Sequence, residues 1–380
     1  MSKKVLIIGA GIGGLSLAAC IKEIERQTNA FHIYDITIVE RDISLSQRPQ
    51  GYSLRLQKNG FETLKFIHLY DAMKTESEPT LRFVSLTKDD EVLKLVDKQF
   101  IPDPSFNLPR EKVRKILFDK TTEDYKVSVL WNKKLTHYEE LEQCVKVYFE
   151  DGEVLEVDIL IGCDGSKSKV RKQLVGDPLS YLGVVSVIGV GISNHKYAQQ
   201  SNIQVLDGNT RLFCKPFDKE RLMWQLTWKS TLEETNALKA ISEKDKSRIL
   251  YEQARVKTKN WTTALMAQLL STTDPSMIKL IPLIDSYDVD KTWSSKRVTI
   301  MGDSAHVMSP FKGQGANNAL QDALELAKAL TKKVELSVAL SEYQLSMQER
   351  SRKYIGEARK AVEFYHNAEC LNPDLIGDEL

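Results

Sequence analysis

The sequence predicts a mixed α/β protein in which a parallel-sheet domain is interleaved with an antiparallel-sheet domain and followed by a C-terminal helix. Residues 4–39 have the pattern of a buried strand, a helix and a second strand, the usual opening of a parallel sheet. Short strands with alternating apolar and polar residues interrupt this pattern at 81–96 and again at 184–228. Residues 337–365 have the periodicity of a terminal helix.

The length of the chain, 380 residues, exceeds the size at which one hydrophobic core usually keeps growing, so two domains are expected. Because the strand-rich segments interrupt the α/β pattern, both domains should be discontinuous. The expected boundaries are 1–78, 105–178 and 281–335 for the parallel-sheet domain, 79–104 and 179–280 for the antiparallel-sheet domain, and 336–380 for the C-terminal helix.

Lysine and arginine number 53 against 52 aspartate and glutamate, and this balance argues against a nucleic-acid or anionic-membrane partner. The five cysteines form no CxxC pair and have no histidine at ligand spacing, which predicts neither disulfides nor a metal site. The apolar run before Gly9 is too short for a signal segment, and no later run approaches the ~18 apolar residues of a membrane span. We expect a cytoplasmic monomer or weak dimer that acts on a small molecule.

The first motif is GAGIGG, directly between the first strand and its helix. Gly9, Gly11 and Gly14 have the G-x-G-x-x-G spacing that permits a tight turn, close approach of a pyrophosphate and close helix packing. Glu40 ends the next strand, where its carboxylate is expected to accept hydrogen bonds from ribose hydroxyls. Because this acid disfavours a 2′-phosphate, the motif predicts a Rossmann-like site for FAD or NAD rather than NADP.

The second motif, GCDGSKSKVR, follows a buried strand at 159–161. Asp164 and Gly165 favour a turn, and Ser166 or Ser168 is expected to cap the helix that follows. Two interpretations remain open for this segment by itself. It is either a structural turn before a basic helix or a second part of the dinucleotide site.

The third motif begins at Gly302 and decides between the two dinucleotides. Asp303 follows a buried strand, at the sheet edge where ligands bind in α/β folds, and its carboxylate suits a polyol hydroxyl. Pro310, Gly313 and Gly315 leave a turn free of large side chains, so a flat ring can approach the backbone. The helix that follows directs its positive end at such a ring, which favours the negative charge of a reduced flavin. Because NAD has no ribitol, the segment predicts FAD.

The antiparallel-sheet segment supplies a candidate substrate wall. Along 222–228 apolar and polar residues alternate, so one face of this strand should be buried. Aromatic side chains there would stack on a flat ligand. An apolar stripe is also the ordinary pattern of a hydrophobic core, and the sequence leaves this alternative open. The candidate residues are Arg211, Phe213, Trp224 and Trp228.

Together and in this order, the three motifs resemble those of the single-component flavoprotein monooxygenases with the p-hydroxybenzoate hydroxylase fold. The resemblance extends from Lys4 to about Leu330. The run RPQGYSLRLQKNG is similar to the tetracycline-inactivating branch, although Arg55 stands where that branch has an acid.

The resemblance also implies roles for individual residues. Glu40 would bind the adenosine ribose and Asp303 the ribitol. Asp164 and Gly165 would form the DG motif, which is tied to both FAD and the nicotinamide donor. The other implied contacts are Arg110 with FAD, Arg48 with flavin or NADPH, and Pro310, Gly313, Gly315 and Asn317 with the isoalloxazine.

The activity implied by the resemblance is hydroxylation of a small aromatic or polyketide-like substrate. NAD(P)H would reduce FAD, and reaction with O₂ would give a C4a-hydroperoxyflavin that transfers oxygen to the substrate. No protein side chain is expected to be catalytic, because the cofactor carries the difficult chemistry, and His306 is expected to pack or form a hydrogen bond. The alternatives are an FAD-dependent oxidase, dehydrogenase or epoxidase on the same scaffold, or a flavin-binding protein without catalysis.

Overall fold

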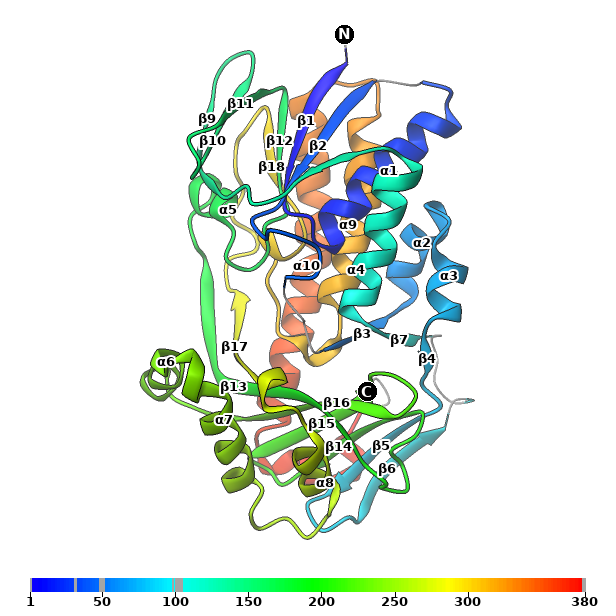
Figure 1. The fold of residues 1–380 in the computed structure, drawn as a ribbon, viewed down its shortest axis with the longest axis vertical. Coiled ribbons are helices and arrows are strands. Elements are labelled where there is room, and N and C mark those ends of the chain that lie inside the picture. Colours follow the sequence, from blue (N-terminus) through cyan, green and yellow to red (C-terminus); the bar gives the residue numbers. More distant parts are fainter. Residues whose placement is uncertain (1, 31–32, 48–51, 98, 100–104, 378–380) are drawn as a thin grey trace.

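The computed structural model describes residues 2–30, 33–47, 52–97, 99 and 105–377, and it has the mixed α/β architecture that the sequence predicts (Figure 1). Its upper part is built on a five-stranded sheet in which all strand pairs are parallel. In spatial order the strands are β18 (Val298–Ile300), β12 (Ile159–Gly162), β1 (Lys3–Ile8), β2 (Tyr34–Val39) and β8 (Ser128–Leu130).

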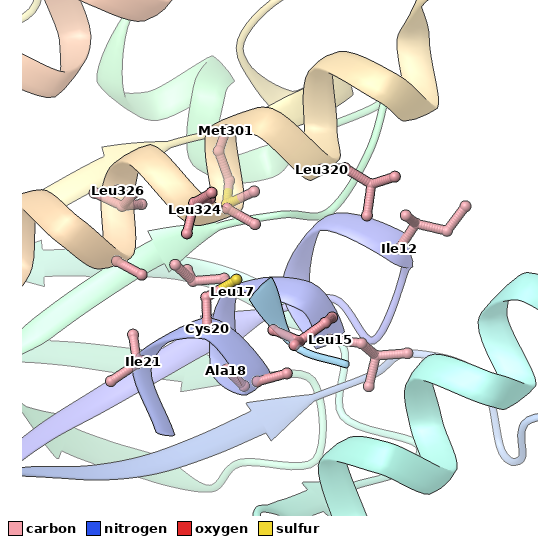
Figure 2. Close-up of a cluster of buried hydrophobic side chains, with 14 of the residues drawn as sticks. Ile12, Leu15, Leu17, Ala18, Cys20, Ile21, Met301, Leu320, Leu324 and Leu326 are labelled. Carbon is pink, nitrogen blue, oxygen red and sulfur yellow. The ribbon is translucent and has the colours of Figure 1, made fainter. Parts of the chain in front are cut away.

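Helices α1 (Ile12–Gln27) and α9 (Gly315–Leu330) pack against each other on one face of this sheet. Figure 2 shows the contact, where Ile12 and Leu17 of α1 face Leu320 and Leu324 of α9. Successive side chains of a strand point to opposite faces. In β1, therefore, Val5 and Ile7 join this helical core, whereas Leu6 and Ile8 join a separate core on the other face.

A small antiparallel sheet and helix α5 (Lys169–Leu174) cover that second face. Its strands are β11 (Val154–Val157), β10 (Val145–Phe149) and β9 (Leu135–Glu140). A hairpin at Asp151-Gly152 joins β10 and β11, where Gly152 takes a φ of +84° and its N–H donates to the carbonyl of Phe149. Strand β9 was not predicted, since its sequence LTHYEE buries only Leu135 and Tyr138.

Several short elements complete the upper part. The three-stranded sheet that they contain leads from the parallel-sheet core toward the lower part of the molecule (Figure 1). These elements are the strands β3 (Ser53–Leu56), β7 (Phe106–Pro109) and β4 (Glu78–Pro79), and the helices α2 (Lys58–Phe66), α3 (Tyr70–Thr75) and α4 (Arg110–Asp119).

The lower part is a seven-stranded sheet. The predicted hairpin at 81–96 forms one of its edges, and it joins the rest of the sheet through a parallel pairing of β5 with β14. In spatial order the strands are β17 (Lys279–Ser286), β13 (Leu179–Ile192), β16 (Arg221–Lys229), β15 (Thr210–Pro216), β14 (Ser201–Leu206), β5 (Arg82–Thr87) and β6 (Val92–Asp97).

The seven-stranded sheet has an outer and an inner face. We call outer the face whose side chains, such as Leu212 and Leu226, pack with α7 (Glu243–Lys257) and α8 (Leu265–Thr272). The inner face lies against the upper part of the molecule, because the N–H of Ser53 in β3 lies 3.4 Å from the sulfur of Met223 in β16. Side chains of this face are largely buried, and many of them are polar.

One expected boundary needs correction. The boundary at 281 falls within β17, which pairs with β13, so residues 281–286 belong to the seven-stranded sheet. Three helices, α6 (Leu232–Ala240), α7 and α8, lie between β16 and β17. The break between α6 and α7 occurs where Ser242 accepts the N–H of Asp245 and starts a new helix.

The long helix α10 (Leu336–Phe364) spans the two parts of the molecule (Figure 1). Near its start the hydroxyl of Tyr343 lies 3.5 Å from the carbonyl oxygen of Ile300 in β18. Near its end Arg359 donates to Asp285 of β17 over 2.9 Å. No helix within the described ranges has both the length and the apolar character needed to cross a membrane.

The contact between α1 and α9 generates a prediction about stability. Leu17 is fully buried there, so Leu17→Ala should lower the free energy of unfolding by about 2–5 kcal/mol, because the cavity cannot fully collapse. Denaturant unfolding measures this change. Leu345→Ala is the matched control, since Leu345 is 62% exposed on α10 and should change stability by no more than about 0.5 kcal/mol. Equal effects of the two substitutions would contradict the assigned core.

Candidate functional site

The three sequence motifs meet at one edge of the parallel sheet. Ile8 of β1 is in register with Gly162 of β12, and Gly162 is in register with Ile300 of β18. The strands are parallel, so the turns that follow them all leave from the same edge. This is the edge at which ligands bind in open α/β folds.

The glycines of the first turn have different local roles. Gly9 has a φ of +115°, and a Cβ there would overlap the carbonyl of Cys163. A Cβ on Gly14 would overlap the carbonyl oxygen of Gly9. In contrast, a Cβ on Gly11 would meet no atom within 4 Å, and no side chain caps the α1 N-terminus at this residue. Gly11 therefore borders open space in front of a helix start, the arrangement that binds phosphates.

A groove of about 400 Å³ opens beside this helix start. Residues of the first motif, of the second motif and of α4 line the groove, so the structure brings together segments that are far apart in the sequence. The predicted residues among those that line it are Gly9, Gly11, Glu40, Arg110, Asp164 and Gly165.

Glu40 is largely buried in this groove and is held in place by three donors. One carboxylate oxygen accepts the N–H of Ala10 over 3.0 Å, and the other accepts the N–H of Asp42 over 3.1 Å. Arg114 lies 3.4 Å from Glu40 and also donates to the carbonyl of Ala10 over 2.8 Å. A carboxylate has about four acceptor sites, so Glu40 keeps capacity for a ligand hydroxyl. Arg114 supports the glycine turn and is not a solvated surface residue.

Arg110 begins α4 and presents an unsatisfied donor. Its Nη1 atom is buried and has no hydrogen-bond partner among the described residues. The guanidinium lies 5.8 Å from the centre of the Tyr52 ring. A buried donor without a partner is costly, and an anionic cofactor in the adjoining groove would remove this cost.

The DG motif supports its neighbours as well as lining the groove. One Asp164 oxygen accepts the N–H of Lys169 at the start of α5 over 2.7 Å, and the other accepts the Ser304 hydroxyl over 3.1 Å. The N–H of Gly165 donates to the same hydroxyl over 2.9 Å. Buried Arg171 donates to the carbonyl of Asp303 over 3.2 Å. The second motif is thus bonded directly to the third.

Asp303 carries the open carboxylate of the site. In the part of the chain that the structure describes, its side chain has no hydrogen bond or ion pair, and it is exposed. A Cβ on Gly315, at the start of α9, would lie 3.5 Å from its Oδ1. The surrounding protein raises the pKa of Asp303 by desolvation, against the opposing charges of His306, Arg110 and Arg171. The carboxylate is therefore placed to accept a ligand hydroxyl beside a helix start.

The turn before α9 has the open form that the sequence predicts. Pro310 begins a short 3₁₀ helix, and Gly313 ends it with a φ of +63°. Asn317 does not face outward. It donates to the carbonyls of Arg55 and Gly313 and accepts the N–H of Gln57 over 2.9 Å, so it ties the turn to β3.

His306 lies in a buried charged cluster. Its Nε2 is 2.6 Å from Oδ2 of Asp322 in α9, which also accepts the N–H of Gly302 over 2.7 Å. Arg350 of α10 donates to the other oxygen of Asp322. Burial alone would lower the pKa of His306, but the Asp322 carboxylate outweighs it and raises that pKa.

The candidate substrate wall divides between the two faces of the seven-stranded sheet. Arg211 and Phe213 lie on the inner face, where Phe311 of the turn before α9 is 4.7 Å from the Arg211 guanidinium. Trp224 and Trp228 lie on the outer face, in the core formed with α7 and α8. The Trp224 indole donates to Thr273 over 2.9 Å. The alternation along β16 was predicted correctly, but it does not indicate which face points to the site.

One predicted site residue cannot be placed, and four residues that support the site were not predicted. Arg48 lies outside the described residues. The sequence analysis did not predict the partners that fix the Asp303 loop in place. One signal was available for Asp322: it lies two helical turns after Gly315, so these two residues lie on the same side of α9. These missed partners are Arg171, Ser304, Asp322 and Arg350.

These features fit FAD. The open space at Gly11 accommodates phosphates, the unsatisfied Arg110 donor suits an anion, and the Asp303 carboxylate suits a ribitol hydroxyl. Gly11 follows β1 and Asp303 follows β18, two strands away along the same sheet edge.

Comparisons with known proteins agree with an FAD-binding protein of this fold. The family model described as FAD binding domain matches residues 2–353. An FAD-dependent monooxygenase of Penicillium brasilianum is 25% identical over 98% of this chain and 81% of its own length. The structure of Klebsiella pneumoniae HpxO complexed with FAD and uric acid has a TM-score of 0.83, with 22% identity over 98% of this chain and 91% of that one. The tetracycline destructase Tet(51) has a TM-score of 0.72, with 20% identity over 97% and 93% of the chains, and so shares the fold.

The different surroundings of two glycines lead to a prediction about binding. Gly11→Ala should leave stability unchanged but weaken FAD binding, because its methyl group fills the open space at the helix start. A steric conflict of about 1–3 kcal/mol corresponds to roughly 5- to 150-fold in Kd. Gly14→Ala should instead lower stability, since its methyl group overlaps the Gly9 carbonyl. Flavin-fluorescence titration and thermal unfolding separate the two effects, and the reverse pattern would refute this assignment.

The buried cluster predicts a dependence of stability on pH. Because the pKa of His306 is raised in the folded protein, its contribution is fully present below the unfolded pKa of about 6.5. It is lost as the pH rises through the folded value. The difference in unfolding free energy between wild type and His306→Asn should therefore shrink from about pH 6 to pH 9. A difference that is constant or grows over this range would show that the imidazole is neutral throughout.

Proposed function

Since the chain belongs to the FAD binding domain family and is an FAD-dependent oxidoreductase, we propose that it is a monooxygenase that uses NAD(P)H and O₂. The proposed reaction is hydroxylation of a small aromatic or polyketide-like substrate. The observation that carries the proposal is the contact between two regions. The turn before α9, which suits a flavin ring, meets the inner face of the seven-stranded sheet where Phe311 contacts Arg211.

Individual residues are proposed to hold successive parts of FAD. The start of α1 at Gly11 would bind the pyrophosphate and Glu40 the ribose. Arg110 would donate to an anionic oxygen of the cofactor, and Asp303 would accept from the ribitol. The start of α9 at Gly315 would face the ring. Bound FAD supplies electron transfer from NAD(P)H to O₂, chemistry that no side chain performs.

A buried cation on the inner face supports the proposal that the substrate is acidic. Burial lowers the pKa of Arg211 to about 10, and no carboxylate of the described residues pairs with it. Its guanidinium lies 4.7 Å from the Phe213 ring and 4.5 Å from the Tyr365 ring, and its Nε donates to Gln204 over 3.0 Å. A cation in such surroundings is well suited to an anionic oxygen on a flat ring.

A second cation lies on the same face. Lys215 is two positions beyond Phe213, so both side chains point inward from β15. Burial, with a smaller effect from Arg55, lowers the pKa of Lys215 to about 7. A substrate with an ionised oxygen would offset the charge at both positions. The similar HpxO structure contains uric acid, a flat compound rich in oxygen, which supports this substrate class.

The chain itself would position the substrate and exclude water. Hydrogen bonds fix polar residues of the inner face to one another, such as Gln225 to Ser186 over 3.0 Å and Gln204 to Ser85 over 2.8 Å. These side chains are buried, so the face presents fixed dipoles in place of mobile water. A dry, preorganised surface of this kind protects reactive oxygen chemistry from side reactions.

The experiment is a screen of aromatic and polyketide-like acids under ¹⁸O₂ with purified flavoprotein and NADH or NADPH. We expect a product that gains one ¹⁸O atom, detected by mass spectrometry together with substrate-dependent NAD(P)H oxidation. Arg211→Gln should retain FAD but raise KM by roughly 10- to 100-fold, because a hydrogen bond to a charged group contributes about 1.5–3 kcal/mol.

Arg221→Gln is the matched control, because Arg221 is exposed at the start of β16 and pairs with Asp218. Its KM should equal that of wild type. Oxidation of an amine or alcohol without gain of ¹⁸O would favour the oxidase or dehydrogenase alternative. Absence of any redox turnover in a flavin-loaded protein across the panel would favour a non-catalytic flavin-binding protein.

A further inference from the structure

The loop that carries Asp303 is held by a carboxylate from α9. Asp322 is fully buried, and its Oδ2 accepts the N–H of Gly302 over 2.7 Å and lies 2.6 Å from His306 Nε2. Gly302 and His306 are the residues that flank the segment Asp303 to Ala305. One carboxylate therefore fixes both ends of the loop, and Asp303 is suspended between them.

The loop also lies directly on α9. Gly302 has a φ of +59°, and a Cβ there would be 3.1 Å from the Cβ of Ala319. This close approach leaves no room for the loop to move toward the helix. On the other side, Arg171 donates to the carbonyls of Asp303 and Ser304 over 3.2 and 3.4 Å. The position of the Asp303 carboxylate is consequently set by its anchors, since its own side chain has none among the described residues.

The C-terminal helix supplies the remaining partner of Asp322. Arg350 of α10 donates one nitrogen to Asp322 and another to Glu325, both on α9. The Asp322 side chain is fully buried and that of Arg350 is 12% exposed. The charge of a buried carboxylate is stable only with close cationic partners. Removal of Arg350 would leave Asp322 with His306 as its one charged hydrogen-bond partner among the described residues.

We propose that Arg350 is a positioning residue for FAD, through which the C-terminal helix α10 holds the loop 302–306 in the geometry that binds the cofactor. The charge of Arg350 keeps Asp322 ionised and oriented, and Asp322 in turn fixes Gly302 and His306. FAD binding and the docking of α10 are then coupled, because each favours the same arrangement of one carboxylate. This inference rests on the proposed role of Asp303 as the ribitol contact.

The direct experiment measures release of FAD from the purified holoprotein by the rise in flavin fluorescence. Arg350→Gln should weaken FAD binding roughly tenfold, which lies within the range of coupling effects that substitutions along such a network produce. Arg350→Lys should restore part of this loss, because it keeps the charge. Arg352→Gln is the matched control. Arg352 lies on the same helix, is 57% exposed and donates to Asp290 over 2.8 Å, so its substitution should leave FAD affinity unchanged.

A second measurement does not depend on a variant that folds. Hydrogen–deuterium exchange of wild-type protein should show slower exchange around Arg350 when FAD is bound than after its removal. Equal FAD affinity of Arg350→Gln and Arg352→Gln overturns the proposal. If Arg350→Gln does not fold, FAD-independent exchange around Arg350 overturns it instead. Asp303→Ala tests the ribitol contact separately from the role of Arg350. If Asp303→Ala retains FAD, the proposed ribitol contact is wrong. If Asp303→Ala loses FAD but Arg350→Gln binds it normally, only the role of Arg350 is refuted.

Discussion

The register of three parallel strands is the constraint on which the site depends. Ile8, Gly162 and Ile300 are aligned across β1, β12 and β18, so the three motifs begin their turns at one level of the sheet. Gly162 permits this alignment, because a Cβ there would overlap Val170 and Ile300. A slip of one residue would reverse the faces of a whole strand. The two helix starts that favour negative charge, those of α1 and α9, are brought to the same edge by this register and by the packing of the two helices.

The local parts of the site were predictable from the sequence, because turn and helix-start chemistry is local. The glycines of the first turn, the Asp164-Gly165 turn and the open segment before α9 all have the expected backbone. The partners of these turns were not predictable. Arg171 donates to the carbonyl of Asp303, 132 positions later in the sequence, and Arg350 donates to Asp322, 28 positions earlier. At such sequence separations, hydrophobic periodicity gives no information about which residues are in contact.

The strand alternation shows a similar limit. It predicted that Trp224 and Trp228 share a face and are buried, but not that helices α7 and α8 cover that face. The unusual property belongs to the opposite face, where arginine, lysine, glutamine and serine are buried. Sequence rules assign buried faces to apolar residues. A buried polar face departs from this rule, and the alternation does not indicate that it is enclosed.

Repeated crossings of the chain between the two parts keep the cofactor turn and the inner face in a fixed relation. The hairpin β5–β6 leaves after β4 and the chain returns at β7, while β13 leaves after α5 and the chain returns after β17. Helix α10 then joins both parts through Tyr343 at one end and Arg359 at the other. Domains joined by one linker usually move relative to each other, whereas these connections oppose such motion. The turn before α9 and the inner face are therefore held in contact, as the distance between Phe311 and Arg211 shows. Motion required for entry of substrate or reductant would then arise in individual segments, because the two parts cannot separate as rigid bodies without breaking the contacts of α10.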